Sequence, residues 1–160
     1  MSSPQNLLNK VYPAWSKCLP SPYGSGAYAP GNNGKTTYCN DYVQEVSAGF
    51  GYIAFKGLLA DDMVAHMKAD TREWTSVSGI VAQQHADAGA LVIAGYVNPS
   101  GHGHVSIVIP GIPAPSGKWN DPDCPVLANV GELIYCKIGL TANWAFDAEP
   151  VYFVLNDSLT

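Results

Sequence analysis

The chain has 160 residues, of which 47% are hydrophobic and 13% are charged, and its formal net charge at pH 7 is −5. A chain of this length buries roughly 70% of the surface that its unfolded form exposes, so we expect a single domain over residues 1–160. Because the chain is acidic, and because no apolar run approaches the roughly 18 residues of a membrane span, we expect neither nucleic acids nor membranes as partners.

The N-terminal region predicts a helix followed by a long loop. Apolar residues at helical spacing place the helix over residues 5–18, with Ser3 or the serine before it as the cap. Pro13 is expected to kink or end this helix because proline cannot donate a backbone hydrogen bond. Residues 19–34 are rich in Gly, Pro, Ser and Asn, and a loop of this length is often functional.

A second helix is expected to start after Thr36 or Thr37, either of which can cap it, and to end at Gly49. Five residues at helical spacing share its apolar face: Cys39, Tyr42, Val43, Val46 and Phe50. The Cys39 thiol is therefore expected to point inward near the start of the helix.

The rest of the chain predicts two more helices and then a set of strands. The helices are expected over residues 58–68, with an apolar stripe that includes Leu59, and from the Ser78 cap through about His85. The predicted strands are residues 90–96, 105–109, 125–130, 134–138 and 151–155. This order predicts an α+β fold in which N-terminal helices pack on an antiparallel β-sheet.

The four cysteines, at positions 18, 39, 124 and 136, show no C-x-x-C spacing, which disfavours a structural zinc site or a thioredoxin-type redox site. If Cys39 stays reduced, the other three allow three alternative disulfides. We favour Cys18 with Cys136, because the longer loop stabilises more in the chain-entropy model.

Cys39 and His104 suggest a thiol nucleophile and its imidazole base. Cys39 sits where a glycine-rich loop turns into a helix, and His104 begins a predicted strand 65 residues later. A helix N-terminus and an imidazolium both lower the pKa of a thiol, which makes it a better nucleophile. His102 and His104 form an H-x-H pair, but no third ligand at sensible spacing supports a metal site.

A catalytic base needs a group that orients it. The chain after the His104 strand is expected to return antiparallel and to bring Asn129 opposite His104, where its amide oxygen can fix the imidazole tautomer. Asp121 and Asp123 are alternatives for this role, although Asn-Asp-Pro-Asp also reads as a turn.

We expect substrate contacts near the start of the Cys39 helix and in the loops. The backbone N–H of Cys39 and a donor near Asn33 and Tyr38 are expected to stabilise an oxyanion. Aromatic residues in Pro/Gly-rich loops are placed along a cleft: Tyr23, Tyr28 and Trp119.

Three segments resemble the NlpC-type papain-like amidases, and most of all the small peptidoglycan amidase effectors of bacterial type VI secretion. These segments are Tyr38–Val46, Ala90–Gly95 and Gly103–Gly111. The resemblance implies a papain-like core without a cofactor. It also implies an enzyme that cleaves amide bonds in the cell-wall peptide stem, with Cys39 as nucleophile and His104 as base.

The resemblance also implies where such an enzyme acts and with what. The N-terminus lacks the pattern of a signal peptide, so we expect synthesis in the cytoplasm and action in the periplasm after injection or lysis-linked release. A monomer and a cognate immunity protein are expected. Two alternatives remain: a phage endolysin with the same chemistry, and a non-catalytic phage-tail or secretion module in which Cys39 is merely buried.

Overall fold

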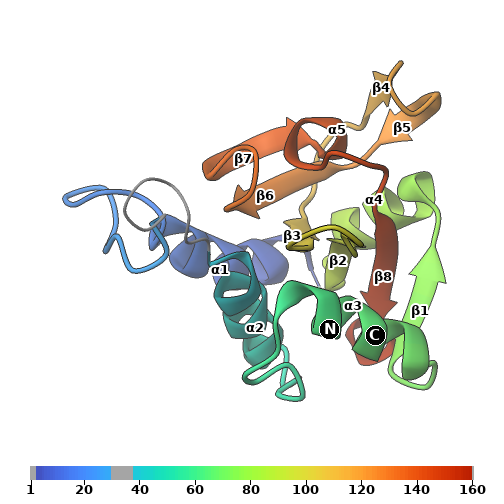
Figure 1. The fold of residues 1–160 in the computed structure, drawn as a ribbon. Coiled ribbons are helices and arrows are strands. Elements are labelled where there is room, and N and C mark those ends of the chain that lie inside the picture. Colours follow the sequence, from blue (N-terminus) through green and yellow to red (C-terminus); the bar gives the residue numbers. More distant parts are fainter. Residues whose placement is uncertain (1–2, 30–37, 160) are drawn as a thin grey trace.

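The computed structural model describes residues 3–29 and 38–159, with helices mainly in the first half of the chain and strands in the second (Figure 1). The helices are α1 (Pro4–Ser16), α2 (Cys39–Gly49), α3 (Ala60–Ala69), α4 (Gly79–Asp87), α5 (Ala142–Ala145) and the 3-10 helix η2 (Asn156–Leu159). The strands are β1 (Trp74–Val77), β2 (Val92–Tyr96), β3 (His104–Val108), β4 (Ala114–Ser116), β5 (Asp121–Cys124), β6 (Val126–Val130), β7 (Cys136–Thr141) and β8 (Val151–Leu155). The predicted α+β class is confirmed.

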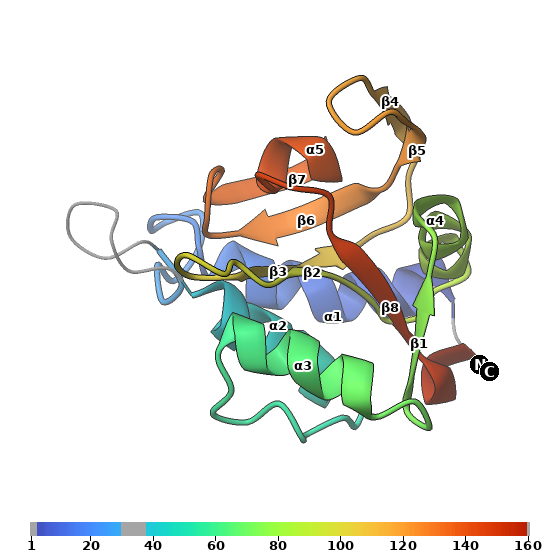
Figure 2. The same cartoon turned by 45° about the vertical axis from the view of Figure 1, so that its right-hand side comes forward.

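A six-stranded sheet organises the fold. Its strand order is β1-β8-β2-β3-β6-β7, every neighbouring pair is antiparallel, and β4 and β5 form a separate two-stranded sheet. Figure 2 shows α2 and α3 on one side of the sheet and α5 on the other side, above β6 and β7. Helix α2 packs against β3 and β6, so the second predicted helix lies directly on the strands that carry His104 and Asn129.

Helix α1 starts as the sequence predicts but does not end at Pro13. The Ser3 side chain accepts a hydrogen bond from the backbone N–H of Asn6 at 3.1 Å, and Pro4 occupies the first turn. The helix continues to Ser16 because Ala14, beyond the proline, is buried on the same face as Leu7 and Val11. Burial of that face outweighs the hydrogen bond that Pro13 cannot make.

The other helices bury the predicted faces except at Leu59 and at Phe50, which is the C-cap residue beyond α2 and is only partly buried. Cys39, Tyr42, Val43 and Val46 are buried on α2, and Ser78 caps α4 by accepting a hydrogen bond from Val81 N–H. Leu59, predicted for the apolar stripe of α3, instead precedes that helix and is 60% exposed. The proposed threonine caps of α2 lie outside the described residues. Among the helices of the described segments, none has both the length and the apolarity to cross a bilayer.

The strands that the alternation of residues predicts are present, and shorter elements were missed. The strand predicted over residues 134–138 is shifted: β7 starts at Cys136 and runs through Gly139 to Thr141. A β-bulge opposite Leu127 and Ala128 takes up Gly139 as the extra residue, and its φ of 84° suits glycine. The pattern also missed β1, β4, β5 and α5, each of which has only three or four residues.

Candidate active site

The three predicted catalytic residues lie on elements that pack together. Cys39 is the first residue of α2, His104 is the first residue of β3, and Asn129 lies in β6. Cys39 is 4% exposed and His104 is 1% exposed, while Asn129 is fully buried. In Figure 2 the start of α2 and the turn that leads into β3 lie at the same end of the molecule.

A direct hydrogen bond joins His104 to Asn129. The imidazole Nε2 lies 2.8 Å from the Asn129 Oδ1 atom. The Asn129 amide nitrogen donates to the carbonyl of Gly131 at 3.0 Å and also to the carbonyl of Ile134, which fixes the orientation of the amide. Because Oδ1 can only accept, Nε2 must carry the proton. In the neutral ring, Nδ1 is then a proton acceptor.

The protonation state of His104 follows from its burial. Removal from solvent lowers the pKa of His104 to about 4, and the hydrogen bond that its Nε2–H donates to Asn129 opposes this only in part. Nδ1 is buried and has no hydrogen-bond partner within the described ranges. At neutral pH the ring is therefore neutral, whereas the sequence pattern suggested an imidazolium beside the thiol. This arrangement suits a general base.

One backbone carbonyl connects the three elements that carry the site. The Ala128 carbonyl accepts a hydrogen bond from the Tyr42 hydroxyl of α2 and another from the Ser106 hydroxyl of β3, each at 3.0 Å. Tyr42 lies one helical turn after Cys39, Ser106 lies two residues after His104, and Ala128 precedes Asn129. Burial raises the pKa of Tyr42 well above its usual value, so its hydroxyl stays a donor. These bonds hold α2 in register with β3 and β6.

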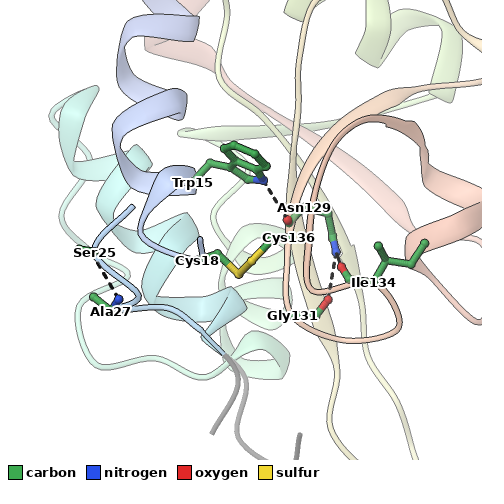
Figure 3. Close-up of a disulfide and its surroundings, with 8 residues drawn as sticks. All are labelled: Trp15, Cys18, Ser25, Ala27, Asn129, Gly131, Ile134 and Cys136. Atoms are coloured by element: carbon green, nitrogen blue, oxygen red, sulfur yellow. Dashed lines mark hydrogen bonds between the residues drawn. A yellow bond between two sulfur atoms is a disulfide. The ribbon is translucent and has the colours of Figure 1, made fainter. Parts of the chain in front are cut away.

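Two further contacts connect the end of α1 to the strands β6 and β7 (Figure 3). The Trp15 indole Nε1 donates to the Asn129 carbonyl at 3.2 Å, and a disulfide joins Cys18 to Cys136 at the start of β7. This is the cystine that the loop-length argument favoured. Because β6 and β7 are paired, both links hold the turn that orients the Asn129 amide.

Phe146 completes the surroundings of His104 and was missed from the sequence. Its ring centroid lies 4.7 Å from that of the imidazole, and both side chains are buried. Phe146 follows α5 and lies 42 residues from His104, so no local pattern could have paired them. Ser106 could have been found, because strand alternation places it on the same face as His104.

The predicted substrate contacts are only partly brought together. Tyr28 stacks on Tyr38, the residue before Cys39, with ring centroids 6.3 Å apart. The Tyr28 hydroxyl donates to Glu45 at 2.7 Å, and Lys17 pairs with the same carboxylate at 2.7 Å. Tyr28 therefore fastens its loop to α2, which is a structural role that its sequence context did not reveal.

The remaining predicted site residues lie elsewhere. Trp119 lines a cavity beside the start of α4 and the start of β8, away from Cys39 and His104. Asp121 and Asp123 line the same cavity and belong to β5, not to a simple turn. They were alternatives for the residue that orients His104, but the side chain that accepts the hydrogen bond from the His104 imidazole is Asn129. Asn33 lies outside the described residues.

Two further observations concern ligands and relatives. Within residues 3–29 and 38–159, no group of three or more His, Cys, Asp or Glu side chains is arranged to hold a metal ion. A comparison with protein-family models and with curated proteins found no match.

Proposed function

We propose that this protein is a cysteine amidase with an NlpC-type papain-like core, which cleaves amide bonds in the peptide stems of the bacterial cell wall. The observation that carries the proposal is the hydrogen bond between His104 and Asn129. It leaves a buried imidazole nitrogen without a partner within the described ranges, on a strand that packs against the helix beginning at Cys39. A cysteine, a histidine and an orienting amide in this order are the parts of a thiol acyl-transfer site.

The reaction would use these residues in two stages. In the first, the Cys39 thiol transfers its proton to His104 Nδ1 as the sulfur attacks the amide carbonyl. Collapse of the tetrahedral intermediate breaks the C–N bond, and the imidazolium gives its proton to the departing amine. In the second, water attacks the thioester with His104 as base, and the carboxylic acid and the thiol are released. Asn129 stabilises the transient imidazolium throughout by accepting from Nε2–H.

The helix start supplies a further element of the site. The backbone N–H groups in the first turn of an α-helix have no acceptor within the helix, and the helix dipole is positive there. Cys39 is the first residue of α2. Its own N–H is thus placed to donate to the negative oxygen of the intermediate, which is the charge that such a site stabilises most.

Digestion of purified sacculi tests the proposal. The wild type should release muropeptides detectable by mass spectrometry, and Cys39→Ala should release none. Cys124→Ala is the matched control, because Cys124 is also buried and not disulfide-bonded but lies outside the site. Equal release by wild type and Cys39→Ala would refute the thiol mechanism. Circular dichroism of each variant shows whether it is folded.

The burial of the site favours one rival function. Cys39 and His104 are both buried, as expected if they are structural residues of a non-catalytic secretion or phage-tail module. That function predicts no muropeptide release by any variant. It also predicts that Cys39→Ala changes the stability and nothing else.

The biological setting of the amidase is part of the proposal. We expect either an antibacterial effector or a lysis enzyme, both acting in the periplasm. An effector would be made together with an immunity protein that covers the site. Copurification of the protein with the product of a neighbouring gene, and protection of sacculi by that product, would distinguish the effector from the lysis enzyme.

A further inference from the structure

The turn between β6 and β7 orients the base of the candidate active site. Two carbonyls of this turn, those of Gly131 and Ile134, accept hydrogen bonds from the amide nitrogen of Asn129. The Oδ1 atom of the same amide accepts from His104 Nε2. If the amide rotated, its nitrogen would face Nε2–H, and two donors cannot bond to each other. The direction of the imidazole therefore depends on the shape of this turn.

The turn has little support from the core of the protein. In the sheet of the described residues, β7 is an edge strand whose one neighbour is β6. None of the described residues 132–136 is buried, and Leu133 is 51% exposed. Gly131 and Glu132 have left-handed φ angles of 82° and 59°, and the second is costly for a residue with a side chain. A segment with so few buried apolar contacts opens easily unless a further link holds it.

The cystine between Cys18 and Cys136 is that link (Figure 3). Cys136 is the first residue of β7 and lies at the base of the turn. Cys18 is 3% exposed and follows the end of α1. Its neighbour Lys17 forms an ion pair with Glu45 of α2, the helix that begins at Cys39. One covalent bond thus joins the turn that orients the base to the part of the protein that carries the thiol.

We propose that this cystine is a redox switch for the candidate active site. When positions 18 and 136 carry thiols, the turn opens, the Asn129 amide is no longer fixed, and His104 loses the orientation that a base needs. Formation of the cystine closes the turn and makes the site competent. Trp15 donates to the Asn129 carbonyl, but it holds the strand before the turn and not the residues that follow.

The switching step is thiol–disulfide exchange with an oxidant that is itself a disulfide. The Cys136 thiolate attacks the oxidant, which forms a mixed disulfide and releases one thiol. The Cys18 thiolate then attacks the Cys136 sulfur and expels the second thiol. The protein loses two electrons and two protons, and the oxidant gains them. Cys136 is the residue that reacts first, because it is half-buried whereas Cys18 is buried.

The switch has a use if the protein is the amidase proposed above. Thiols stay reduced in the cytoplasm, and disulfides form in the periplasm. An enzyme that is made in the first compartment and attacks the cell wall from the second would stay inactive until it was oxidised. This role rests on the proposed function, whereas the effect of the cystine on His104 does not.

The test compares the protein with and without the cystine, in the Cys39→Ala background so that the cystine cannot rearrange through Cys39. The readout is the NMR signal of the His104 Nε2–H proton, identified with His104→Gln. In the oxidised protein this proton should exchange slowly with solvent, because its bond to Asn129 is buried. Reduction with dithiothreitol, or Cys18→Ala combined with Cys136→Ala, should speed the exchange about tenfold or more while far-UV circular dichroism remains that of a folded protein. Oxidised glutathione should restore slow exchange after reduction but not in the double variant.

A control separates the switch from a general loss of stability. Leu155→Ala removes a buried side chain from β8, which three strands separate from β7 in the sheet order. This variant, or Leu155→Val if the first does not fold, should keep the slow exchange. The proposal is overturned if loss of the cystine leaves the exchange rate unchanged or if the control speeds it equally. Unfolding of the reduced protein also overturns it, since the cystine would then hold the whole fold.

Sacculus digestion tests the amidase function separately. With Cys39 present, loss of the cystine should lower muropeptide release about tenfold or more, because the base is no longer held. An oxidised protein that releases no muropeptides refutes the amidase, while the NMR result still decides whether the cystine controls His104.

Discussion

Replacement of His104 by glutamine should remove a pH-dependent part of the stability. The unfolded chain protonates this histidine near pH 6.5, but burial lowers the pKa in the folded state to about 4. Between these values the unfolded state binds the extra proton, so the free energy of unfolding falls as the pH falls. The linkage relation gives a loss of about 2 kcal/mol between pH 7 and pH 4.5, and about 3 kcal/mol once the pH lies well below 4.

The assay is urea unfolding of wild type and His104→Gln at pH 7 and at pH 4.5, followed by far-UV circular dichroism. Glutamine does not titrate, and its amide N–H can still reach the Asn129 oxygen. Carboxylates titrate in both proteins, so the quantity of interest is the difference between the two losses. Wild type should lose about 2 kcal/mol more than the variant. Equal losses would show that His104 is not held neutral in a buried site.

Three further changes follow from the contacts around the site. Tyr42→Phe removes a buried hydrogen bond and should lower the free energy of unfolding by about 1 kcal/mol, whereas the same change at exposed Tyr12 should have no effect in urea melts. Cys18→Ser opens a cystine that spans 118 residues and should cost about 3 to 5 kcal/mol, measured as a shift of the urea midpoint. Asn129→Asp keeps an acceptor and adds a negative charge, which should raise the pKa of His104; a pH–rate profile whose acid limb does not move to higher pH would contradict this.

The helices and the central strands could be predicted because their signals are local. Serine caps, apolar residues at helical spacing and runs of β-branched residues locate α2, α4, β3 and β8 to within a few residues. Asn129 could be found as well, since an antiparallel return after β3 brings β6 beside it, and Asn129 is the one polar residue of that strand.

The missed features depend on contacts between distant parts of the chain. Strand β1 exists because Trp74 to Val77 pair with β8, which lies almost 80 residues later. Helix α1 passes Pro13 because the sheet and its neighbouring helices bury the residue that follows. The bulge at Gly139 lengthens a strand that local alternation would end. None of these has a signal within a short sequence window.

The candidate site also has features that the sequence could predict and features that depend on contacts between distant residues. Residue type and context led to Cys39 and His104 as the proposed nucleophile and base. The contacts that surround them depend on tertiary structure: the shared Ala128 carbonyl, the Trp15 indole and the Phe146 ring. Trp119 shows what the sequence could not predict: an aromatic residue in a loop could line any cleft of the molecule. The structure places it in the cavity beside the start of α4 and the start of β8.

The most direct test of a working Cys39 and His104 pair is the rate at which iodoacetamide alkylates Cys39, mapped by mass spectrometry. Transfer of the thiol proton to the imidazole should make Cys39 react rapidly at pH 7, and His104→Gln should slow it about tenfold or more. Cys124, whose pKa burial raises to about 11, is the internal control and should react slowly in both proteins. Equal Cys39 rates in wild type and His104→Gln would contradict the proposed chemistry.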